Sequence, residues 1–266
     1  MFTVVIPAYN CENTILRTLK SVINQTRFDL IDAIIVIDDG SIDKTGEIVK
    51  KFQDEFSVKI NYVKQDNHGV SFSRNRGIRM AQSSWIALLD SDDEWLSNKI
   101  ERQHEIIEQI KDIKFLGSQY PLKILFKKRQ GLVKLNAKEL CIRSMPPTPS
   151  VVFERETGVK LGLFDEKMQY SEDMEFFQKF LLLDSYYVLA EKLINIDTGK
   201  KFHGQSGLSS CYIAMHKGRN ANVEKMYNMG LISKTYMFFI LAFNELKLIR
   251  RVLIRALNRG FEFILK

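Results

Sequence analysis

The first hundred residues alternate short apolar runs with amphipathic segments, and this alternation constrains the fold more than any other feature of the chain. Three runs are continuously apolar, as expected of strands that are buried on both faces: 4–6, 33–37 and 85–89. Between them lie three segments with helical spacing of apolar residues and one further strand-like segment: 14–24, 44–56, 71–81 and 58–63. This order predicts an α/β fold with a doubly wound, mostly parallel sheet flanked by helices.

Beyond residue 100 the alternation becomes less regular. A helix is expected at 96–112, a strand at 150–153, and a second helix that begins near Ser171. Residues from about 211 onward have helical patterns. The expected division of the chain has three parts: 1–100 and 101–210, which together form a main domain at 1–210, and a helical C-terminal extension at 211–266.

The composition is that of an ordinary soluble globular protein, with 45% hydrophobic and 27% charged residues. Cys11, Cys141 and Cys211 lie far apart, so neither a disulfide framework nor a zinc framework is expected. The first residues form a strand-like run rather than a signal peptide, and no apolar run approaches the roughly 20 residues that span a bilayer. These observations predict a cytoplasmic protein.

The net charge of +7 is concentrated near the end of the chain. Residues 247–266 hold six Lys or Arg residues and one acid, Glu262, so the rest of the chain is nearly neutral. A protein that binds nucleic acid needs basic residues spread over a binding face. The sequence therefore argues against nucleic acid as a partner.

Polar side chains follow three of the predicted strands at the points where those strands end. They lie in three short segments: 7–10, 38–41 and 90–93. In a doubly wound sheet, ligands bind at the carboxyl ends of the strands, where loops and helix N-termini meet. We therefore expect the three segments to line one crevice.

Asp90, Ser91 and Asp92 place two carboxylates on alternate residues after a buried strand. Two close carboxylates repel each other by about 1 to 4 kcal/mol, depending on the local dielectric. Together with phosphate oxygens they supply the hard ligands that Mn²⁺ or Mg²⁺ prefers, which predicts a divalent metal here. The alternative is a helix N-cap, for which Ser91 or Asp93 is competent. A calcium-binding EF-hand loop is excluded, because Trp95 stands where that loop requires glycine.

Asp39 precedes Gly40, and an Asp-Gly pair is a strong signal for a turn. The same carboxylate can accept a hydrogen bond from N3–H of uracil, while Pro7 and Tyr9 can offer flat apolar contact to the ring. The nucleophile loop of phosphohydrolases is disfavoured, because Ile37 stands where the first aspartate of that loop belongs. Both interpretations of Asp39, as a turn residue and as a ligand, stay open at this point.

A series of segments follows a recognisable order and spacing along the chain. The series is dense over residues 3–100 and sparse afterwards: 4–10, 25–26, 36–45, Gly69 with 73–77, 88–95, 162–165, 171–173 and 203–206. Together these segments resemble glycosyltransferase family 2. One departure is that the usual Gly-Gly-Phe-Asp of the family is Gly162-Leu163-Phe164-Asp165 in this chain.

The resemblance implies a GT-A fold, a UDP-sugar donor and inversion at the anomeric carbon. By similarity, the residues that would bind the nucleotide sugar are Pro7, Tyr9 and Asp39 at the uridine, Asp90 and Ser91 at the ribose or diphosphate, and Arg74 and Asn75 on the donor-side helix. Asp92 would bind the metal. The half at 1–100 would then bind the nucleotide, and the half at 101–210 the acceptor.

Inverting transfer requires a base that takes the proton from the acceptor hydroxyl as this oxygen attacks the anomeric carbon. The resemblance places Glu172 and Asp173 in this catalytic role, with Asp173 as the base. The alternative is that both acids only begin a helix, where negative charge is favourable. His203 corresponds to a position from which an imidazole can reach the diphosphate or the metal; otherwise it is a structural histidine.

The end of the chain carries an apolar stripe flanked by basic residues at helical spacing. The apolar and the basic members are Leu246, Ile249, Leu253 and Leu257, and Arg250, Arg251, Arg255 and Arg259. A basic amphipathic helix of this kind is typical of binding to an anionic membrane surface. The alternative is that this helix packs on the main domain or in a dimer.

The leading interpretation is an inverting glycosyltransferase that moves a hexose or N-acetylhexosamine from a UDP-sugar to a saccharide hydroxyl. By resemblance, the acceptor would be lipid-linked and the product a surface polysaccharide such as O-antigen or capsule, made at the cytoplasmic face of the inner membrane. A non-catalytic sugar-nucleotide-binding or membrane-scaffold protein on the same fold is the second interpretation. The acids Asp39, Asp90, Asp92 and Asp173 favour the enzyme, because a scaffold has no need of all four.

Overall fold

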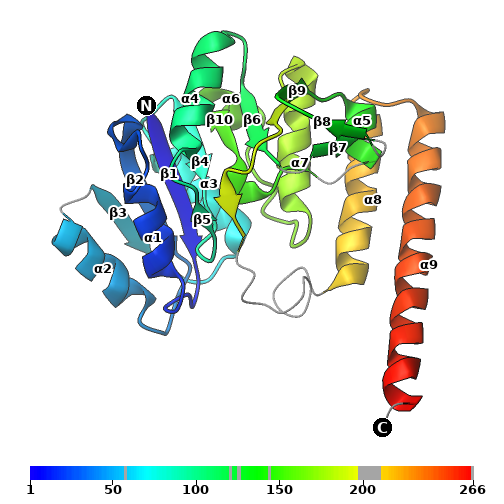
Figure 1. The fold of residues 1–266 in the computed structure, drawn as a ribbon, viewed down its shortest axis with the longest axis horizontal. Helices are drawn as coiled ribbons and strands as arrows, with labels where there is room; N and C mark the ends of the chain where they lie inside the picture. Colours follow the sequence, from blue (N-terminus) through cyan, green and yellow to red (C-terminus); the bar gives the residue numbers. More distant parts are fainter. Residues whose placement is uncertain (57–58, 120–121, 125–126, 143–144, 197–210, 265–266) are drawn as a thin grey trace.

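The fold is built around an eight-stranded sheet with helices on both faces (Figure 1). The structure is a computed structural model. It describes residues 1–266 except for these short segments: 57–58, 120–121, 125–126, 143–144, 197–210 and 265–266. The strand order of the sheet is β3-β2-β1-β4-β10-β6-β11-β9.

The first half of the sheet is parallel, as the sequence predicts. Its strands are β1 (Phe2–Ala8), β2 (Ile31–Asp38), β3 (Ile60–Lys64) and β4 (Trp85–Leu88). The central strand β1 pairs in parallel with β2 on one side, where Val5 lies opposite Ile35, and with β4 on the other, where Val5 lies opposite Leu88. The helices that connect these strands are α1 (Ile15–Ile23), α2 (Thr45–Phe56) and α3 (Val70–Met80).

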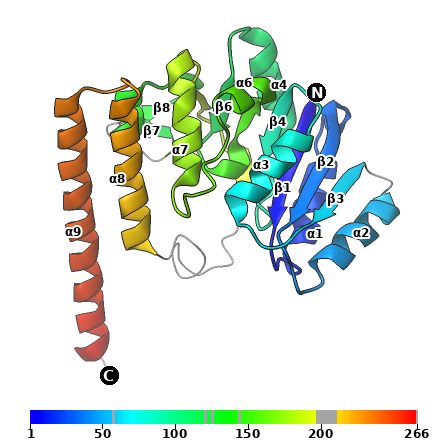
Figure 2. The same cartoon turned by 180° about the vertical axis from the view of Figure 1, so that it is seen from behind.

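Alternate side chains of these strands enter two separate apolar layers, because successive residues of a strand point to opposite faces. Val5 packs in the layer that contains Ile78 of α3, whereas Val4 packs in the layer that contains Ile15 and Leu19 of α1. Figures 1 and 2, seen from opposite sides, place α1 and α3 on opposite faces of the sheet. Strands that are buried on both faces need continuous apolar runs, which is the pattern that the sequence shows.

The second half of the sheet is mixed rather than parallel. The strands β10 (Val152–Glu154), β6 (Phe115–Ser118), β11 (Tyr187–Leu189) and β9 (Leu132–Lys134) complete the sheet. β10 runs antiparallel to both β4 and β6, β11 runs parallel to β6, and β9 runs antiparallel to β11. In the sheet that the structure describes, four of the seven strand pairs are parallel, so the expectation of a mostly parallel sheet is confirmed, with the antiparallel pairs all in or next to the second half.

Smaller elements surround this half. Two short ribbons pair β5 (Glu94–Trp95) with β12 (Ile194–Asn195), and β7 (Leu122–Ile124) with β8 (Lys127–Arg129). The helices here are α4 (Lys99–Gln109), α5 (Ala137–Ile142), α6 (Arg155–Lys160) and α7 (Glu172–Gln178). Three short 3₁₀ helices lie at Phe28–Leu30, Thr148–Ser150 and Lys179–Leu183.

The C-terminal extension consists of two long helices, α8 (Tyr212–Asn228) and α9 (Lys234–Ile264). Figure 2 shows α7, α8 and α9 side by side, with the end of α9 projecting beyond the rest of the molecule. Val223 and Met226 of α8 are fully buried and belong to the same apolar cluster as Phe176 of α7. The extension is thus continuous with the main core. Within the described part of the chain, no helix is both long and apolar enough to cross a membrane.

Candidate active site

A cavity of about 470 Å³ opens at the carboxyl ends of β1, β2 and β4, where the sequence predicts a crevice. We call it the donor cavity. It is lined by Pro7, Ala8, Tyr9, Asp39, Asn67, Gly69, Val70, Ser73, Arg74, Asp90, Ser91, Asp92 and Glu172. Eight of the predicted site residues are therefore brought together, among them Asp39, Asp90 and Asp92.

Asp39 lies at the end of β2, and its carboxylate is fixed by three hydrogen bonds. Oδ1 accepts from Nε2 of Gln65 at 2.7 Å and from the backbone N–H of His68 at 2.9 Å. Oδ2 accepts from the backbone N–H of Gly69 at 2.8 Å. Because a carboxylate has about four acceptor positions, Oδ2 retains one for a ligand. Asp39 thus precedes a turn at Gly40, where φ is +84°, and also presents an acceptor to the cavity.

Pro7 and Tyr9 form the apolar wall of the cavity beside Asp39. Pro7 belongs to β1 and is buried, whereas Tyr9 follows the strand and is 54% exposed. An exposed aromatic ring next to a fixed carboxylate can cover one face of a planar base while the carboxylate accepts from its edge. This arrangement fits the predicted uridine contacts.

Gln65 and the turn at residues 67–69 are parts of the site that sequence reasoning missed. Besides its bond to Asp39, Nε2 of Gln65 lies 3.2 Å from Oγ of Ser73, and its Oε1 accepts from Arg76 at 2.9 Å. Gly69 has φ +91°, a conformation that favours glycine, and it begins α3. The only signal in the sequence was this glycine ahead of a helical segment.

The loop that carries Ser91 is held in place by α1. The backbone oxygen of Ser91 accepts hydrogen bonds from Oγ1 of Thr14 at 2.8 Å and from Oγ1 of Thr18 at 3.0 Å. The backbone oxygen of Asp92 accepts from Arg17 at 2.9 Å. These contacts use backbone atoms, so the side chains of the loop can face the donor cavity.

The alternative that this loop caps a helix is wrong. The chain continues from Asp93 into the short strand β5, and the next helix, α4, begins only at Lys99, with Asn98 at its N-cap. In the first turn of α4, the backbone N–H of Ile100 donates instead to Oε1 of Gln25 at 3.0 Å.

The donor set of the cavity fits a hard divalent cation. Asp90 and Asp92 both line it, and Mg²⁺ is commonly held by one or two carboxylates together with phosphate oxygens. No group of three or more potential ligands is assembled among the described residues, so a ligand such as a diphosphate would have to supply the remaining oxygens. His203, the other predicted metal ligand, lies outside the described residues.

Arg74 of α3 joins the two halves of the site. Its guanidinium donates to Oδ1 of Asp90 at 2.8 Å and to Oε1 of Glu172 at 3.0 Å, and the side chain is almost completely buried. Burial opposes the charge, but Asp90 and Glu172 outweigh it and raise the pKa of Arg74 well above its usual value. Arg74 therefore stays charged and links the end of β4 to the start of α7.

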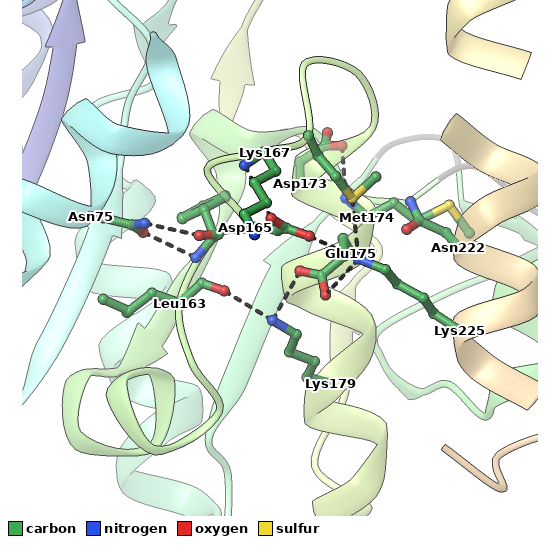
Figure 3. A network of polar contacts seen from close by, with 12 residues as sticks. Asn75, Leu163, Asp165, Lys167, Asp173, Met174, Glu175, Lys179, Asn222 and Lys225 are labelled. Carbon is green, nitrogen blue, oxygen red and sulfur yellow. Dashed lines mark hydrogen bonds and ion pairs between the residues drawn. The ribbon is translucent and has the colours of Figure 1, made fainter. Parts of the chain in front are cut away.

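Asn75, predicted to face the donor, lies elsewhere (Figure 3). Its Nδ2 donates to the backbone oxygen of Phe164 at 2.9 Å and to Glu166 at 2.8 Å, and its Oδ1 accepts from the backbone N–H of Phe164 at 3.0 Å. The residue is 1% exposed and does not line the donor cavity. Its side chain fixes the loop at 162–165 instead.

That loop is also tied to α7 and α8 by ion pairs (Figure 3). Lys225 of α8 lies 3.0 Å from Asp165 and 3.3 Å from Glu175, and Lys179 lies 2.9 Å from Glu175. Leu163 has φ +57° and is only 3% exposed. The leucine that departs from the family pattern thus occupies a backbone conformation that suits glycine, while its side chain fills the core.

Glu172 and Asp173 form the first turn of α7, directly after Ser171, whose φ is +59°. Glu172 lines the donor cavity and binds Arg74, whereas Oδ1 of Asp173 accepts from the backbone N–H of Met174 at 2.7 Å. Burial raises the pKa of both carboxyls. A raised pKa is typical of a carboxyl group that acts as a base. Both acids begin a helix, and Glu172 lines the donor cavity with Asp173 next to it in the chain, so both interpretations are compatible with the geometry.

The segment before Glu172 is held by α8. Nδ2 of Asn222 donates to the backbone oxygen of Ser171 at 2.8 Å. A Cβ at Gly218 would lie only 2.6 Å from the backbone oxygen of Tyr170, so glycine permits this close approach of helix and loop. The C-terminal extension therefore positions the candidate base.

The predicted apolar stripe of α9 is exposed where the structure describes its side chains, at Leu246, Ile249 and Leu253. Met237, Ile240 and Asn244 are buried. Other positions of α9 also expose large apolar side chains: Phe238, Phe239, Val252 and Ile254. The other residues of the predicted stripe, Arg255, Leu257 and Arg259, lie beyond the side chains that the structure describes.

Comparison with known sequences points to one family. Residues 3–131 match the model of the family described as Glycosyl transferase family 2. The chain is 28% identical over 200 residues to the minor teichoic acid biosynthesis protein GgaA of Bacillus subtilis (strain 168). The matched region covers 70% of this chain and 44% of that protein. It is 37% identical over 110 residues to the UDP-Glc:alpha-D-GlcNAc-diphosphoundecaprenol beta-1,3-glucosyltransferase WfaP of Escherichia coli. That matched region covers 41% of this chain and 41% of WfaP. The chain thus spans less than half the length of these two relatives.

Solved structures share the fold. The S. aureus TarS fragment 1–349 in complex with UDP-GlcNAc matches with a TM-score of 0.69 at 20% identity, over 91% of this chain and 71% of that one. The mannosyltransferase PcManGT from Pyrobaculum calidifontis in complex with GDP-Man and Mn²⁺ matches with a TM-score of 0.67 at 14% identity, over 100% of this chain and 80% of that one. These likenesses confirm the GT-A fold expected from the sequence.

Proposed function

We propose that this chain is an inverting glycosyltransferase that uses a UDP-sugar, because residues 3–131 match the model of glycosyltransferase family 2. The transferred group is a hexose or N-acetylhexosamine, and the acceptor is a saccharide hydroxyl. One observation carries the proposal: Asp39, Asp90, Asp92 and Glu172 line a single cavity at the strand ends, and Asp173 follows directly. A merely structural role would not require these acids to converge.

The donor is held by the first half of the chain in this proposal. Asp39 accepts from the uracil edge, Pro7 and Tyr9 cover the ring, and Asp90 with Ser91 lies toward the ribose and diphosphate. Support for a UDP-sugar comes from the names of similar proteins, since WfaP is named for UDP-Glc and the TarS fragment was solved with UDP-GlcNAc. Asn75 contributes indirectly, by fixing the loop at 162–165.

Asp92, with Asp90 beside it, would hold Mn²⁺ or Mg²⁺ against the diphosphate, and His203 is a further proposed ligand. When bound, the ion offsets the negative charge that develops on the departing diphosphate. Support comes from the donor set of the cavity and from the Mn²⁺ in the similar mannosyltransferase structure. Arg74 keeps Asp90 oriented while the cavity is being filled.

Asp173 acts as the general base. The acceptor oxygen attacks the anomeric carbon opposite the diphosphate, the bond to the diphosphate breaks, and the hydroxyl proton passes to Asp173. Attack from the opposite face inverts the configuration. Glu172 positions this turn through Arg74, and Ser171 is held from behind by Asn222.

The product in this proposal is a surface polysaccharide such as O-antigen or capsule, built on a lipid-linked acceptor at the cytoplasmic face of the inner membrane. Support comes from the names of GgaA and WfaP, which refer to teichoic acid synthesis and to a diphosphoundecaprenol-linked acceptor. The exposed apolar side chains of α9, such as Phe238 and Leu246, suit contact with a membrane surface. Residues 1–210 form the catalytic domain in this scheme, and 211–266 the extension.

Hydrolysis of UDP-sugars separates this enzyme from a non-catalytic scaffold on the same fold. A panel of UDP-sugars is incubated with the chain, with and without Mn²⁺, and release of UDP and protection against thermal unfolding are measured. We expect metal-dependent protection by UDP-sugars and slow metal-dependent hydrolysis, both lost in Asp92→Asn. Protection without any hydrolysis or transfer, in the presence of metal, would favour the scaffold.

A further inference from the structure

A second cavity, also of about 470 Å³, lies between α8 and α9, outside the donor cavity. We call it the C-terminal groove. It is lined by Met215, His216, Arg219, Asn244, Lys247, Leu248, Arg250, Arg251 and Ile254. The two helices that form it lie side by side in both views (Figures 1 and 2).

Among the residues that the structure describes, the lining of the C-terminal groove contains four Lys or Arg residues and no acid. An exposed acid outside this lining, Glu245, contacts one of the lining residues. Its Oε1 lies 2.7 Å from Nε2 of His216 and accepts from Asn220 at 3.1 Å. The positive charge of the groove is therefore not balanced by its own lining.

The cations of the groove oppose one another. Arg219 is exposed at the surface of the groove, and partial desolvation together with the charge of Arg251 lowers its pKa. Burial likewise lowers the pKa of Lys247, and the charge of Arg219 adds to this. Packing of α8 against α9 holds these like charges together, and Asn244 of α9 donates to Asn220 of α8 at 2.9 Å. An anion in the groove would relieve the repulsion and gain charge-assisted hydrogen bonds.

The first turns of α8, which help to line the groove, also contact the residue that precedes the candidate base pair. Met215, which lines the groove, accepts a hydrogen bond at its backbone oxygen from Oγ of Ser171 at 3.5 Å. The negative charge of Asp173 acts on Arg219 across this short span. A group bound in the groove would therefore lie close to the acceptor side of the donor cavity.

The groove also has an apolar part, formed by Met215, Leu248 and Ile254. Ile254 is half exposed, and the neighbouring Leu253 continues the apolar surface along α9. A purely inorganic anion would leave this surface in water, whereas an anion joined to an apolar chain would cover it. The lining thus matches an amphipathic ligand with a compact, multiply charged head.

We propose that the C-terminal groove binds the diphosphate that joins an acceptor saccharide to its apolar chain. The inference rests on the proposed function, which it extends by giving the acceptor a second point of attachment. A diphosphate matches several cations better than a singly charged phosphodiester of a bilayer lipid does. Arg219 and Arg251 bind the diphosphate, the apolar chain runs along Leu248 and Ile254, and the saccharide points toward Asp173.

The test measures binding of soluble stand-ins by isothermal titration calorimetry on the full chain. Farnesyl diphosphate and inorganic pyrophosphate are titrated in EDTA, so that no metal can bridge a diphosphate to Asp92. We expect farnesyl diphosphate to bind more tightly than pyrophosphate. In the double variant Arg219→Gln/Arg251→Gln it should bind at least about tenfold more weakly, because two charge-assisted contacts are lost.

The matched control is Lys217→Gln/Lys234→Gln, which removes the same charge from exposed positions of α8 and α9 outside the groove. It should bind farnesyl diphosphate like the unchanged chain. Equal weakening in both double variants, equal affinity for pyrophosphate and farnesyl diphosphate, or binding only to phosphatidylglycerol vesicles would overturn the assignment. UDP-sugar hydrolysis needs no acceptor, so its failure would count against the proposed function and leave the groove to be judged by this titration.

Discussion

In the first half of the molecule, Pro7, Asp39 and Asp90 each lie where a parallel strand ends, so the topology of the sheet alone brings them together. In the second half, Asp173 lies at the start of a seven-residue helix, and distant segments hold it in place. Asn222 and Gly218 of α8 fix the residues just before it. One half of the site is built by a regular sheet, and the other by individual long-range contacts.

Because the two halves of the site are held differently, substitutions in them should have different effects. A substitution in the first half should mainly change how the donor binds, because the sheet keeps its strands in place. A substitution in the second half should mainly change transfer, because a small displacement of α7 or α8 moves the base. Arg74 belongs to both halves and should affect both.

The largest effect is expected for Asp173→Asn, which tests whether the second half acts on transfer alone. Loss of a general base should lower the transfer rate by about 10² to 10⁴ while UDP and Mn²⁺ still bind. Rates are measured by UDP release with acceptor present, and donor binding by calorimetry. Asp184→Asn, at an exposed acid outside both cavities, is the control; turnover near that of the control would remove Asp173 as the base.

Arg74→Gln tests whether the two halves depend on one cation. It leaves Asp90 and the buried Glu172 without their shared partner, so the free energy of unfolding should fall by about 3 kcal/mol or more. Arg79→Gln breaks an exposed pair with Glu166 and should cost less than about 1 kcal/mol. Urea denaturation measures both. Similar losses in the two variants would mean that Arg74 is no more than a surface cation.

Gly218→Ala tests whether α8 positions the base. In an ordinary helix this change stabilises by up to about 1 kcal/mol, but here the new Cβ would meet the backbone of Tyr170 at 2.6 Å. The loop before Asp173 must shift, so transfer should slow between about tenfold and a hundredfold, with little change in the dissociation constant of UDP. An unchanged transfer rate would show that the close contact between α8 and Tyr170 does not help to position Asp173.

Leu163 allows a comparison of glycine and alanine in the same backbone. Both replacements lose the buried leucine, but only glycine adopts φ +57° without strain, so Leu163→Gly should be more stable than Leu163→Ala by about 1 kcal/mol. Leu140, a buried residue of α5, is the control, because there alanine should be the more stable by a similar amount. Thermal unfolding of the four variants decides whether the two positions differ.

The smallest effect is the upward shift of the midpoint in the pH profile of transfer. Burial raises the pKa of Asp173 and Glu172, and a base must be deprotonated to act. The transfer rate should therefore be at its maximum above the raised pKa and fall about tenfold per pH unit below it. The midpoint of this fall should lie above the value of about 3.9 that is usual for aspartate. Initial rates across the acidic range test this, with folding followed by circular dichroism. A midpoint at or below 4 would contradict the buried environment of the pair.

Sequence reasoning predicted the first half well because its signals are local. Apolar runs marked β1, β2 and β4, and polar residues directly after them marked the site. The sequence predicted a strand at 150–153, where β10 (Val152–Glu154) lies, but not that this strand inserts antiparallel between β4 and β6. Pairing of that kind depends on the whole sheet and leaves little trace in a short segment.

Side-chain partners far apart in sequence were also beyond prediction. Arg74 and Asn75 are neighbours on α3, yet one binds Asp90 and Glu172 and the other binds Phe164. The family resemblance marks both positions but not their partners, because the direction of each side chain depends on how α7 and its preceding loop pack. For the same reason, the groove between α8 and α9 became visible only when both helices were placed.

The ion pairs of Arg74 have a consequence for exchanging parts between relatives. A chimera joined near residue 100 would take the cation at position 74 from one parent and the acid at position 172 from the other. If the incoming chain lacks that acid, the buried guanidinium of Arg74 loses one of its two partners and is left with Asp90 alone. Segments exchanged between relatives to change the acceptor should therefore leave Glu172 in place. In the proposed scheme, Arg74 connects the residues that bind the donor with those that act on the acceptor.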